Sequence, residues 1–214
     1  MKIVTLCSGG LDSTVLLYFL RHEGHEVVAL IFEYGQKHKK ETSYAANKCD
    51  DLGVLRHHCY LDSPVANVPL MGKGEIPNGY YTDESMKKTI VPSRNATFLS
   101  IAWGVAINKN ADAISFAAHS GDHPIYPDCR PEFVNAMETA LRMGSESDMR
   151  ILTPFIGKDK TAIVKIGSTL GVDFADTWSC YKGEKFHCGK CGTCSERIEA
   201  FQLSGVKDPT IYKE

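Results

Sequence analysis

Residues 7–14 combine the amino-acid types and the spacing of a phosphate-binding turn. They read Cys-Ser-Gly-Gly-Leu-Asp-Ser-Thr and directly follow a β-favouring run at residues 2–6. Adjacent glycines let the backbone approach an oxyanion closely, and the unpaired N–H groups at the start of a helix carry a positive partial charge. We therefore predict a pyrophosphate site made of Ser8, Gly9, Gly10, Leu11, Asp12, Ser13 and Thr14.

Two better-known phosphate-binding patterns do not describe this turn. The dinucleotide fingerprint needs glycines spaced as G-x-G-x-x-G, and the Walker A loop needs G-K-[ST]. Residues 7–14 contain neither pattern. An ordinary Ser/Gly turn, with Asp12 or Ser13 as the helix N-cap, is the structural alternative.

Four cysteines between residues 180 and 194 have the spacing of a metal site. Cys180, Cys188, Cys191 and Cys194 are separated by seven, two and two residues, and the glycines after Cys188 and Cys191 permit tight turns. Four thiolates suit tetrahedral Zn²⁺ and leave no position open for water, so we predict a structural zinc ion. An iron–sulfur cluster also uses four thiolates and is the alternative, which would indicate radical or sulfur-transfer chemistry.

The elements that would position these residues alternate between strands and helices. The patterns predict strands at 2–6, 27–32, 57–61, 113–118 and 151–152, and helices at 14–22, 41–51, 95–108, 131–143, 158–170 and 196–203. This alternation indicates one α/β domain, residues 1–214, with a doubly wound, mainly parallel sheet and the cysteine knuckle at 180–194. The Pro- and Gly-rich stretch 63–89 predicts a long functional loop.

The composition excludes several classes of protein. With 214 residues, 43% of them hydrophobic and 23% charged, the chain is expected to be globular. A net charge of -2 offers no broad basic field, so nucleic acid is not an expected partner. The apolar run at 27–32 is far shorter than a bilayer span, so we expect neither a membrane span nor a signal peptide. Crowded cysteines favour metal binding in a reducing cytosol.

The string S-G-G-x-D-S after an N-terminal strand resembles the ATP-pyrophosphatase, or PP-loop, superfamily. The resemblance implies that ATP binds on this turn and that the substrate is activated by adenylation, with release of pyrophosphate. Asp12 and Ser13 would be catalytic residues, and Asp12 would help to position Mg²⁺ and the triphosphate. Backbone N–H groups would stabilise the charge on the leaving pyrophosphate.

Further strings extend the resemblance along nearly the whole chain. They lie at 34–38 (Tyr-Gly-Gln-Lys-His), 91–100, 126–133 (Tyr-Pro-Asp-Cys-Arg-Pro-Glu-Phe), 177–181 and 188–201. Together they resemble the 7-cyano-7-deazaguanine (preQ0) synthase family. The resemblance implies a homodimeric carbon–nitrogen ligase that converts 7-carboxy-7-deazaguanine, ammonia and ATP to the nitrile, through adenylated carboxylate and amide intermediates, in queuosine- or archaeosine-type biosynthesis.

Some polar residues of these strings are candidates for the substrate site. Arg94 can engage phosphate or carboxylate oxygens with a fork of donors, whereas its neighbour Asn95 is equally suited to cap the next helix. Asp128 and Arg130 are candidates for the purine edge and the carboxylate, with a surface salt bridge as the alternative.

Other polar residues have a weaker claim to the site. Lys158 and Lys160 near a helix start would face phosphate or, as most such lysines do, solvent. For His119, Asp122 and His123, a packed or capped histidine is favoured over a general base.

Three other functions compete with nitrile synthesis. A related PP-loop ligase would pass the acyl-adenylate to a different amine and stop at the amide. A PP-loop tRNA-thiolation enzyme would need catalytic cysteines next to the nucleotide, whereas the spacing here is more typical of a structural knuckle. A zinc-ribbon binding module with an inactive nucleotide fold would not need the intact turn at residues 8–14.

Overall fold

A computed structural model describes residues 1–37, 39–61, 68–71, 74–80 and 84–213. Within these residues the strands form one five-stranded sheet in the order β3-β2-β1-β4-β5, and every neighbouring pair is parallel. The strands are β1 (Lys2–Leu6), β2 (Glu26–Glu33), β3 (Leu55–Tyr60), β4 (Ala113–Ser115) and β5 (Arg150–Leu152). The chain therefore adds β2 and β3 on one side of β1 and then adds β4 and β5 on the other side.

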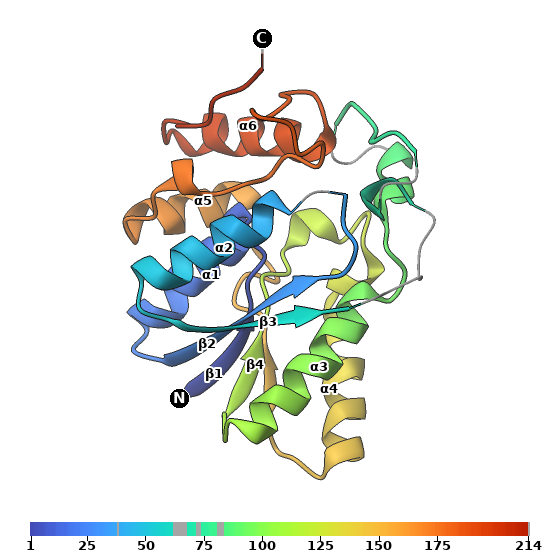
Figure 1. The fold of residues 1–214 in the computed structure, drawn as a ribbon, viewed down its shortest axis with the longest axis vertical. Coiled ribbons are helices and arrows are strands. Elements are labelled where there is room, and N and C mark those ends of the chain that lie inside the picture. Colours follow the sequence, from blue (N-terminus) through green and yellow to red (C-terminus); the bar gives the residue numbers. More distant parts are fainter. Residues whose placement is uncertain (38, 62–67, 72–73, 81–83, 214) are drawn as a thin grey trace.

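Helices cover both faces of this sheet, as Figure 1 shows. They are α1 (Leu11–His22), α2 (Lys40–Asp51), α3 (Arg94–Asn108), α4 (Pro131–Ser145), α5 (Lys160–Thr169) and α6 (Gly192–Ser204). The helices α1, α2 and α5 lie on one face with α6 beyond α5, and α3 and α4 lie on the other face. The predicted doubly wound parallel fold is confirmed.

Alternation along the strands explains why both faces are covered. In β1, Ile3 packs into the core formed with α1 and α5, while Val4 packs into the core formed with α3 and α4. In β2, Ala29 and Val28 divide between the two cores in the same way. Strands that are apolar on both faces are typical of a parallel sheet buried between helical layers.

The order of the strands locates the ligand crevice. β1 pairs with β2 on one side and with β4 on the other, so the direction of winding reverses between β1 and β4. In open parallel sheets, ligands bind beyond the carboxyl ends of the strands at such a reversal. Residues 7–14 follow β1 directly, so the predicted phosphate-binding turn lies at this position.

The boundaries of some elements differ from the predictions. α1 starts at Leu11 and α6 at Gly192, both earlier than expected, because Gly10 and Cys191 are their N-caps. β4 ends at Ser115 because its partner β5 pairs with only three of its residues.

The long loop predicted at 63–89 lies partly outside the described residues, as does His38. Its described part contains short 3₁₀ helices at Pro69–Met71 and Glu84–Thr89. Leu70 and Ile76 of this stretch pack with the cysteine segment in a third apolar cluster. Among the described helices, none is both long and apolar enough to cross a membrane.

Candidate active site

The turn between β1 and α1 is shaped by one glycine. Gly9 has a φ of +81°, and a Cβ at this position would lie 2.1 Å from the carbonyl oxygen of Glu41 and 2.7 Å from the amide nitrogen of Ala45. Only glycine tolerates both this conformation and this close approach to α2. Gly10 then caps α1 without a side-chain hydrogen bond, so the helix start is not closed by a capping side chain.

The side chains of the turn leave polar atoms free for a ligand. The hydroxyls of Ser8 and Ser13 are 3.0 Å apart, and the Ser8 backbone N–H donates to Ser13 Oγ. Among the described residues, Asp12 Oδ1 and Thr14 Oγ1 are buried without a hydrogen-bond partner. Buried polar atoms are rarely left unpaired, so this turn has the character of an incomplete binding site.

A cluster of charged side chains surrounds Asp12. Lys160 Nζ lies 3.3 Å from Asp12 Oδ2 and also bonds Glu196 Oε2, while His119 Nε2 lies 3.8 Å from Asp12 Oδ2. Burial raises the pKa of Asp12, but Lys160 and His119 outweigh this effect and the pKa is lowered overall. The Asp12 carboxylate is therefore ionised and oriented before any ligand arrives.

Burial disfavours the charged forms of both Lys160 and Glu196, but neighbouring charges change the outcome for Lys160. Burial opposes the charged form of Lys160, yet Asp12, Glu196 and Asp122 together raise its pKa. The pKa of Glu196 is raised by its burial, although Lys160 opposes this effect. The cluster thus holds one firmly protonated lysine beside the phosphate-binding turn.

A cavity extends from this turn towards the start of α3. Its lining includes Asp12 and Ser13 of the turn and Arg94. Aromatic rings also line it, and Phe32 and Phe98 are stacked with centroids 4.1 Å apart. Flat apolar walls of this kind suit a heteroaromatic ring, and the polar lining groups suit its substituents.

Arg94 is a fixed cation in this cavity. It is the first residue of α3, and burial opposes its charge, but Tyr34, Tyr181 and Asp128 raise its pKa. A guanidinium that stays protonated can hold an anionic group of a ligand with two parallel hydrogen bonds.

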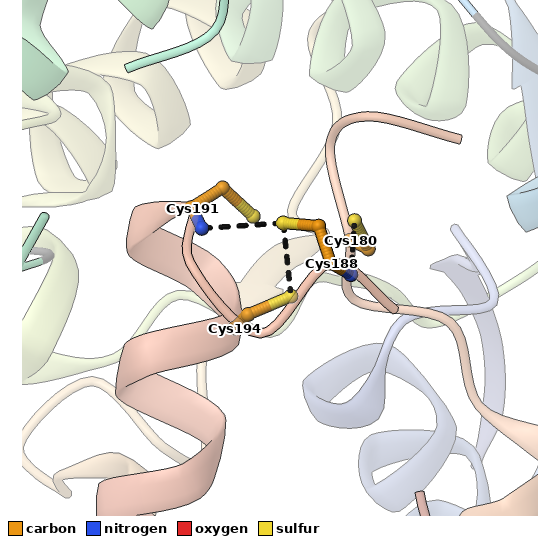
Figure 2. A group of neighbouring side chains, drawn as sticks. All are labelled: Cys180, Cys188, Cys191 and Cys194. Carbon is orange, nitrogen blue, oxygen red and sulfur yellow. Dashed lines mark hydrogen bonds between the residues drawn. The ribbon is translucent and has the colours of Figure 1, made fainter. Parts of the chain in front are cut away.

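The four predicted metal-ligating cysteines converge, as Figure 2 shows. Their sulfur atoms all lie within 4.8 Å of one another, and all four side chains are buried. A set of four thiols this close together is suited to a bound metal.

The cysteine segment also supports the phosphate-binding turn. The backbone N–H of Trp178 donates to the Gly9 carbonyl at 3.0 Å, and its indole N–H donates to the Cys180 carbonyl. The Trp178 ring contacts His187 at 4.2 Å between centroids, and His187 Nε2 accepts the Ser179 N–H. The segment therefore forms one wall of the cavity and is tied to the turn by hydrogen bonds.

Comparison with known proteins places these features in one family. A model of the family described as "Queuosine biosynthesis protein QueC" matches residues 2–205. The chain belongs to the QueC family. The predicted resemblance and enzyme class are thereby confirmed.

Similar proteins match this QueC-family chain over its whole length. The 7-cyano-7-deazaguanine synthases of Caldicellulosiruptor saccharolyticus and Methanoregula boonei are each 46% identical over 216 residues, which is 100% of this chain and 96% and 100% of theirs. The synthase of Allorhizobium ampelinum is 48% identical and is covered to 93%.

Solved structures of low sequence identity share the fold. The NMN synthetase of Francisella tularensis gives a TM-score of 0.54 at 13% identity, over 96% of this chain and 77% of that one. A 4-thiouridine synthetase in complex with RNA and ATP gives a TM-score of 0.50 at 18% identity, over 95% of this chain and 50% of that one. These likenesses bear on the fold alone.

Several residues predicted for the QueC-family site do line the cavity. They are Ser8, Gly10, Leu11, Asp12, Ser13, Arg94 and Asn95. Gly9 and Thr14 belong to the same turn but are not among the lining residues. Asn95 is not a helix cap, because α3 starts at Arg94 and Ser93 is its N-cap. Instead, the Asn95 side chain donates to the Asp128 carbonyl at 3.3 Å.

Asp128 and Arg130 are not among the residues that line the cavity. The Asp128 carboxylate accepts the backbone N–H of Asn95 at 3.1 Å, so it supports the helix start that carries Arg94. Arg130 is exposed, and its Nε donates to the His123 carbonyl at 2.8 Å.

Glu41 lines the cavity although nothing in the sequence indicated it. Lys160, a candidate to face phosphate, lines the cavity beside Asp12, and Tyr181 of the string 177–181 lines it as well. His119 is packed, as expected, but it is packed against the Asp12 carboxylate. Their positions depend on crossovers between strands, which no local spacing reveals.

Proposed function

We propose that this QueC-family chain converts 7-carboxy-7-deazaguanine, ammonia and two ATP to 7-cyano-7-deazaguanine, two AMP and two diphosphate. Membership of the family, with relatives named 7-cyano-7-deazaguanine synthase matched over their full length, is the observation that carries this proposal. The phosphate-binding turn and the aromatic cavity beside it are consistent with a nucleotide and a flat heterocycle meeting at one place.

The reaction requires two activations at the same carbon, first of the carboxylate and then of the amide. A carboxylate is a poor acceptor because its leaving group would be oxide, whereas adenylation supplies AMP as a good leaving group. Attack by ammonia then gives the amide. Adenylation of the amide oxygen in the same cavity lets a second AMP depart, and this leaves the nitrile.

The residues of the turn have distinct roles in this proposal. Backbone N–H groups at the start of α1 hold the β- and γ-phosphates, and the hydroxyls of Ser8 and Ser13 add donors. Lys160 neutralises charge that develops on the leaving diphosphate, since it lies beside Asp12 and stays protonated. Arg94, which lines the same cavity, holds the substrate carboxylate.

Asp12 fits a magnesium ion bound with the triphosphate. Its Oδ1 is buried and unpaired among the described residues, and a carboxylate oxygen is a ligand that Mg²⁺ prefers. When bound, the ion would neutralise phosphate charge and orient the α-phosphate. Asp12 itself contributes an ionised, fixed carboxylate at that point.

Cys180, Cys188, Cys191 and Cys194 fit a structural zinc ion. Four convergent, buried thiols supply the complete tetrahedral ligand set, with no position left for a reacting water. We assign the ion a structural role because its ligands pack in an apolar cluster with Trp178 and do not line the cavity.

The remaining parts of the proposal concern assembly and location. Residues 1–214 act as a single domain, in a homodimer in the cytoplasm, on small molecules and not on nucleic acid. Asp128 acts on the substrate through the start of α3, and Arg130 contacts the substrate carboxylate only if a partner subunit or a ligand draws its side chain inward.

A direct assay tests the proposed function. Purified, metal-loaded protein is incubated with ATP, ammonium and 7-carboxy-7-deazaguanine, and products are identified by mass spectrometry. AMP, diphosphate and the nitrile are expected. Product that stops at the amide, or that carries another amine, would identify the related ligase, and absence of AMP would reject adenylation altogether.

A further inference from the structure

Glu41 lies beside the phosphate-binding turn but has no part in the roles described so far. It belongs to the first turn of α2, and its backbone is pressed against Gly9 at the point where a Cβ could not fit. Its side chain is partly buried and lines the same cavity as Asp12 and Arg94. A carboxylate thus faces the place where nucleotide and substrate would meet.

The surroundings of Glu41 leave its carboxylate available. Among the described residues, no hydrogen bond or ion pair to its carboxylate is formed, and Arg94 is the charged group with an electrostatic effect on it. Burial raises the pKa of Glu41 to about 7, although Arg94 opposes this change. The other titratable groups that line the cavity are Cys7, Asp12, Tyr34, Asp122, Tyr126, Cys129, Lys160 and Tyr181.

The other carboxylates near the turn are already engaged. Asp12 pairs with Lys160, and Glu196 bonds the same lysine. Asp122 lies 3.5 Å from His119. Burial raises the pKa of the Tyr181 phenol well above its usual range, so it does not accept protons at neutral pH.

The reaction needs a proton acceptor at nitrogen. After ammonia attacks the acyl-adenylate, the new C–N bond leaves a positive charge on nitrogen, and an N–H bond must break as the C–O bond to AMP breaks. In the second activation, the remaining two N–H protons leave nitrogen as the nitrile forms. A base whose pKa is near the working pH is best suited to such transfers.

We propose that Glu41 is the catalytic base that removes these protons from nitrogen, an inference that rests on the proposed function. In each transfer the N–H bond breaks, its electron pair stays on nitrogen, and the proton goes to a Glu41 carboxylate oxygen. The electron pair of the broken C–O bond leaves with the phosphate oxygen of AMP. Glu41 then releases the proton to solvent, and no other reactant is needed.

The test separates adenylation from proton removal. Exchange of labelled diphosphate into ATP, dependent on the carboxylate substrate, reports adenylation alone. Conversion of the purified amide and ATP to the nitrile reports the second activation, without interference from the ionisation of ammonia. For Glu41→Gln we expect exchange within about threefold of the wild type and nitrile formation slowed by about 10²- to 10⁴-fold.

The pH profile supplies a second readout. Nitrile formation by the wild type should increase with pH up to about 7, where the Glu41 carboxyl loses its proton, and then level off. This increase should be absent in Glu41→Gln and partly restored in Glu41→Asp. Glu199→Gln is the matched control, because Glu199 is exposed on α6 and outside the cavity, and it should behave like the wild type.

Other results would overturn the inference in distinguishable ways. If Glu41→Gln loses exchange as severely as nitrile formation, Glu41 binds substrate and is not the base. If nitrile formation is unchanged in Glu41→Gln, or its pH dependence persists, the base is another group. If the wild type itself supports neither exchange nor nitrile formation, the proposed function fails and the inference fails with it.

Discussion

The phosphate-binding turn and the cysteine knuckle are both tight, glycine-containing turns that lead into a helix, yet they present their N-termini differently. At the first, Gly10 caps α1, and Asp12 Oδ1 stays unpaired beside the cavity. At the second, Cys191 caps α6, and the side chain of Met86 covers Gly192 so closely that a Cβ there would lie 2.7 Å from its sulfur. The cysteine turn thus presents buried sulfur atoms, whereas the phosphate-binding turn borders a cavity.

This difference suggests a division of labour between stability and turnover. The knuckle's sulfur atoms face one another, and a metal there would add to folding free energy. The turn's unpaired polar groups lower the stability of the ligand-free protein. We expect the same groups to stabilise charge on the ligand during the reaction. The hydrogen bond from Trp178 to Gly9 connects the two, so damage to the knuckle should also weaken the turn.

The largest effect is expected from breaking the knuckle. Cys194→Ser should lose the metal and lower the unfolding midpoint by about 10 °C or more, because a structural metal site contributes directly to folding. Calorimetry and metal analysis measure both quantities. Cys59→Ser is the matched control, since Cys59 is half-buried on β3 and outside the cluster, and it should change neither. An unchanged unfolding midpoint in Cys194→Ser would contradict a structural role for the metal.

A change at the phosphate-binding turn should reduce catalysis and leave the metal in place. Asp12→Asn should reduce diphosphate exchange by about 10³-fold, since it removes a fixed charge at the phosphates, while the metal content stays unchanged. Asp148→Asn controls for loss of a carboxylate at a fully exposed site. Retained exchange in Asp12→Asn would contradict the assignment of this turn to the triphosphate.

The close approach of Gly9 to α2 can be measured separately from its backbone conformation. Gly9→Ala adds a Cβ 2.1 Å from the Glu41 carbonyl oxygen, whereas Gly24→Ala adds one in open space at nearly the same φ, +77° against +81°. Gly24→Ala should cost about 1 kcal/mol of unfolding free energy, and Gly9→Ala about 3 kcal/mol. Equal costs in denaturant titrations would show that α2 does not constrain the turn.

The sequence predicted what is local and missed what the crossovers bring together. The turn at residues 7–14 and the four cysteines could be found because their residues are close along the chain. Lys160 and Glu196 join Asp12 because α5 packs against α1 and α6 packs against α5, as Figure 1 shows. Spacing carries no trace of such contacts.

Patterns in the sequence also did not reveal the contacts that hold the start of α3. Asn95 was expected to be equally suited as a helix cap, but its side chain donates to Asp128, which lies 33 residues further along the chain. Asp128 and Arg130 belong to the string 126–133, which carries part of the family resemblance, yet both side chains bond to backbone groups. A residue in a characteristic string can therefore support the backbone around a site, and sequence patterns do not distinguish this role from contact with the substrate.

The smallest effect concerns the stability cost of a carboxyl group beside the phosphate-binding turn. Glu41 has a pKa of about 7 in the folded chain against 4.5 for a free glutamate, so the folded state binds the extra proton between these values. Stability is therefore lost as the pH rises through this window, and the cost persists at higher pH. Glu41→Gln should be near neutral at pH 4.5 and stabilising by about 2 kcal/mol at pH 8. Chemical denaturation at both pH values measures the difference, with Glu199→Gln expected to show none. If Glu41→Gln changes the unfolding free energy equally at pH 4.5 and pH 8, the Glu41 carboxyl group is solvated in the folded chain and its ionisation does not lower stability.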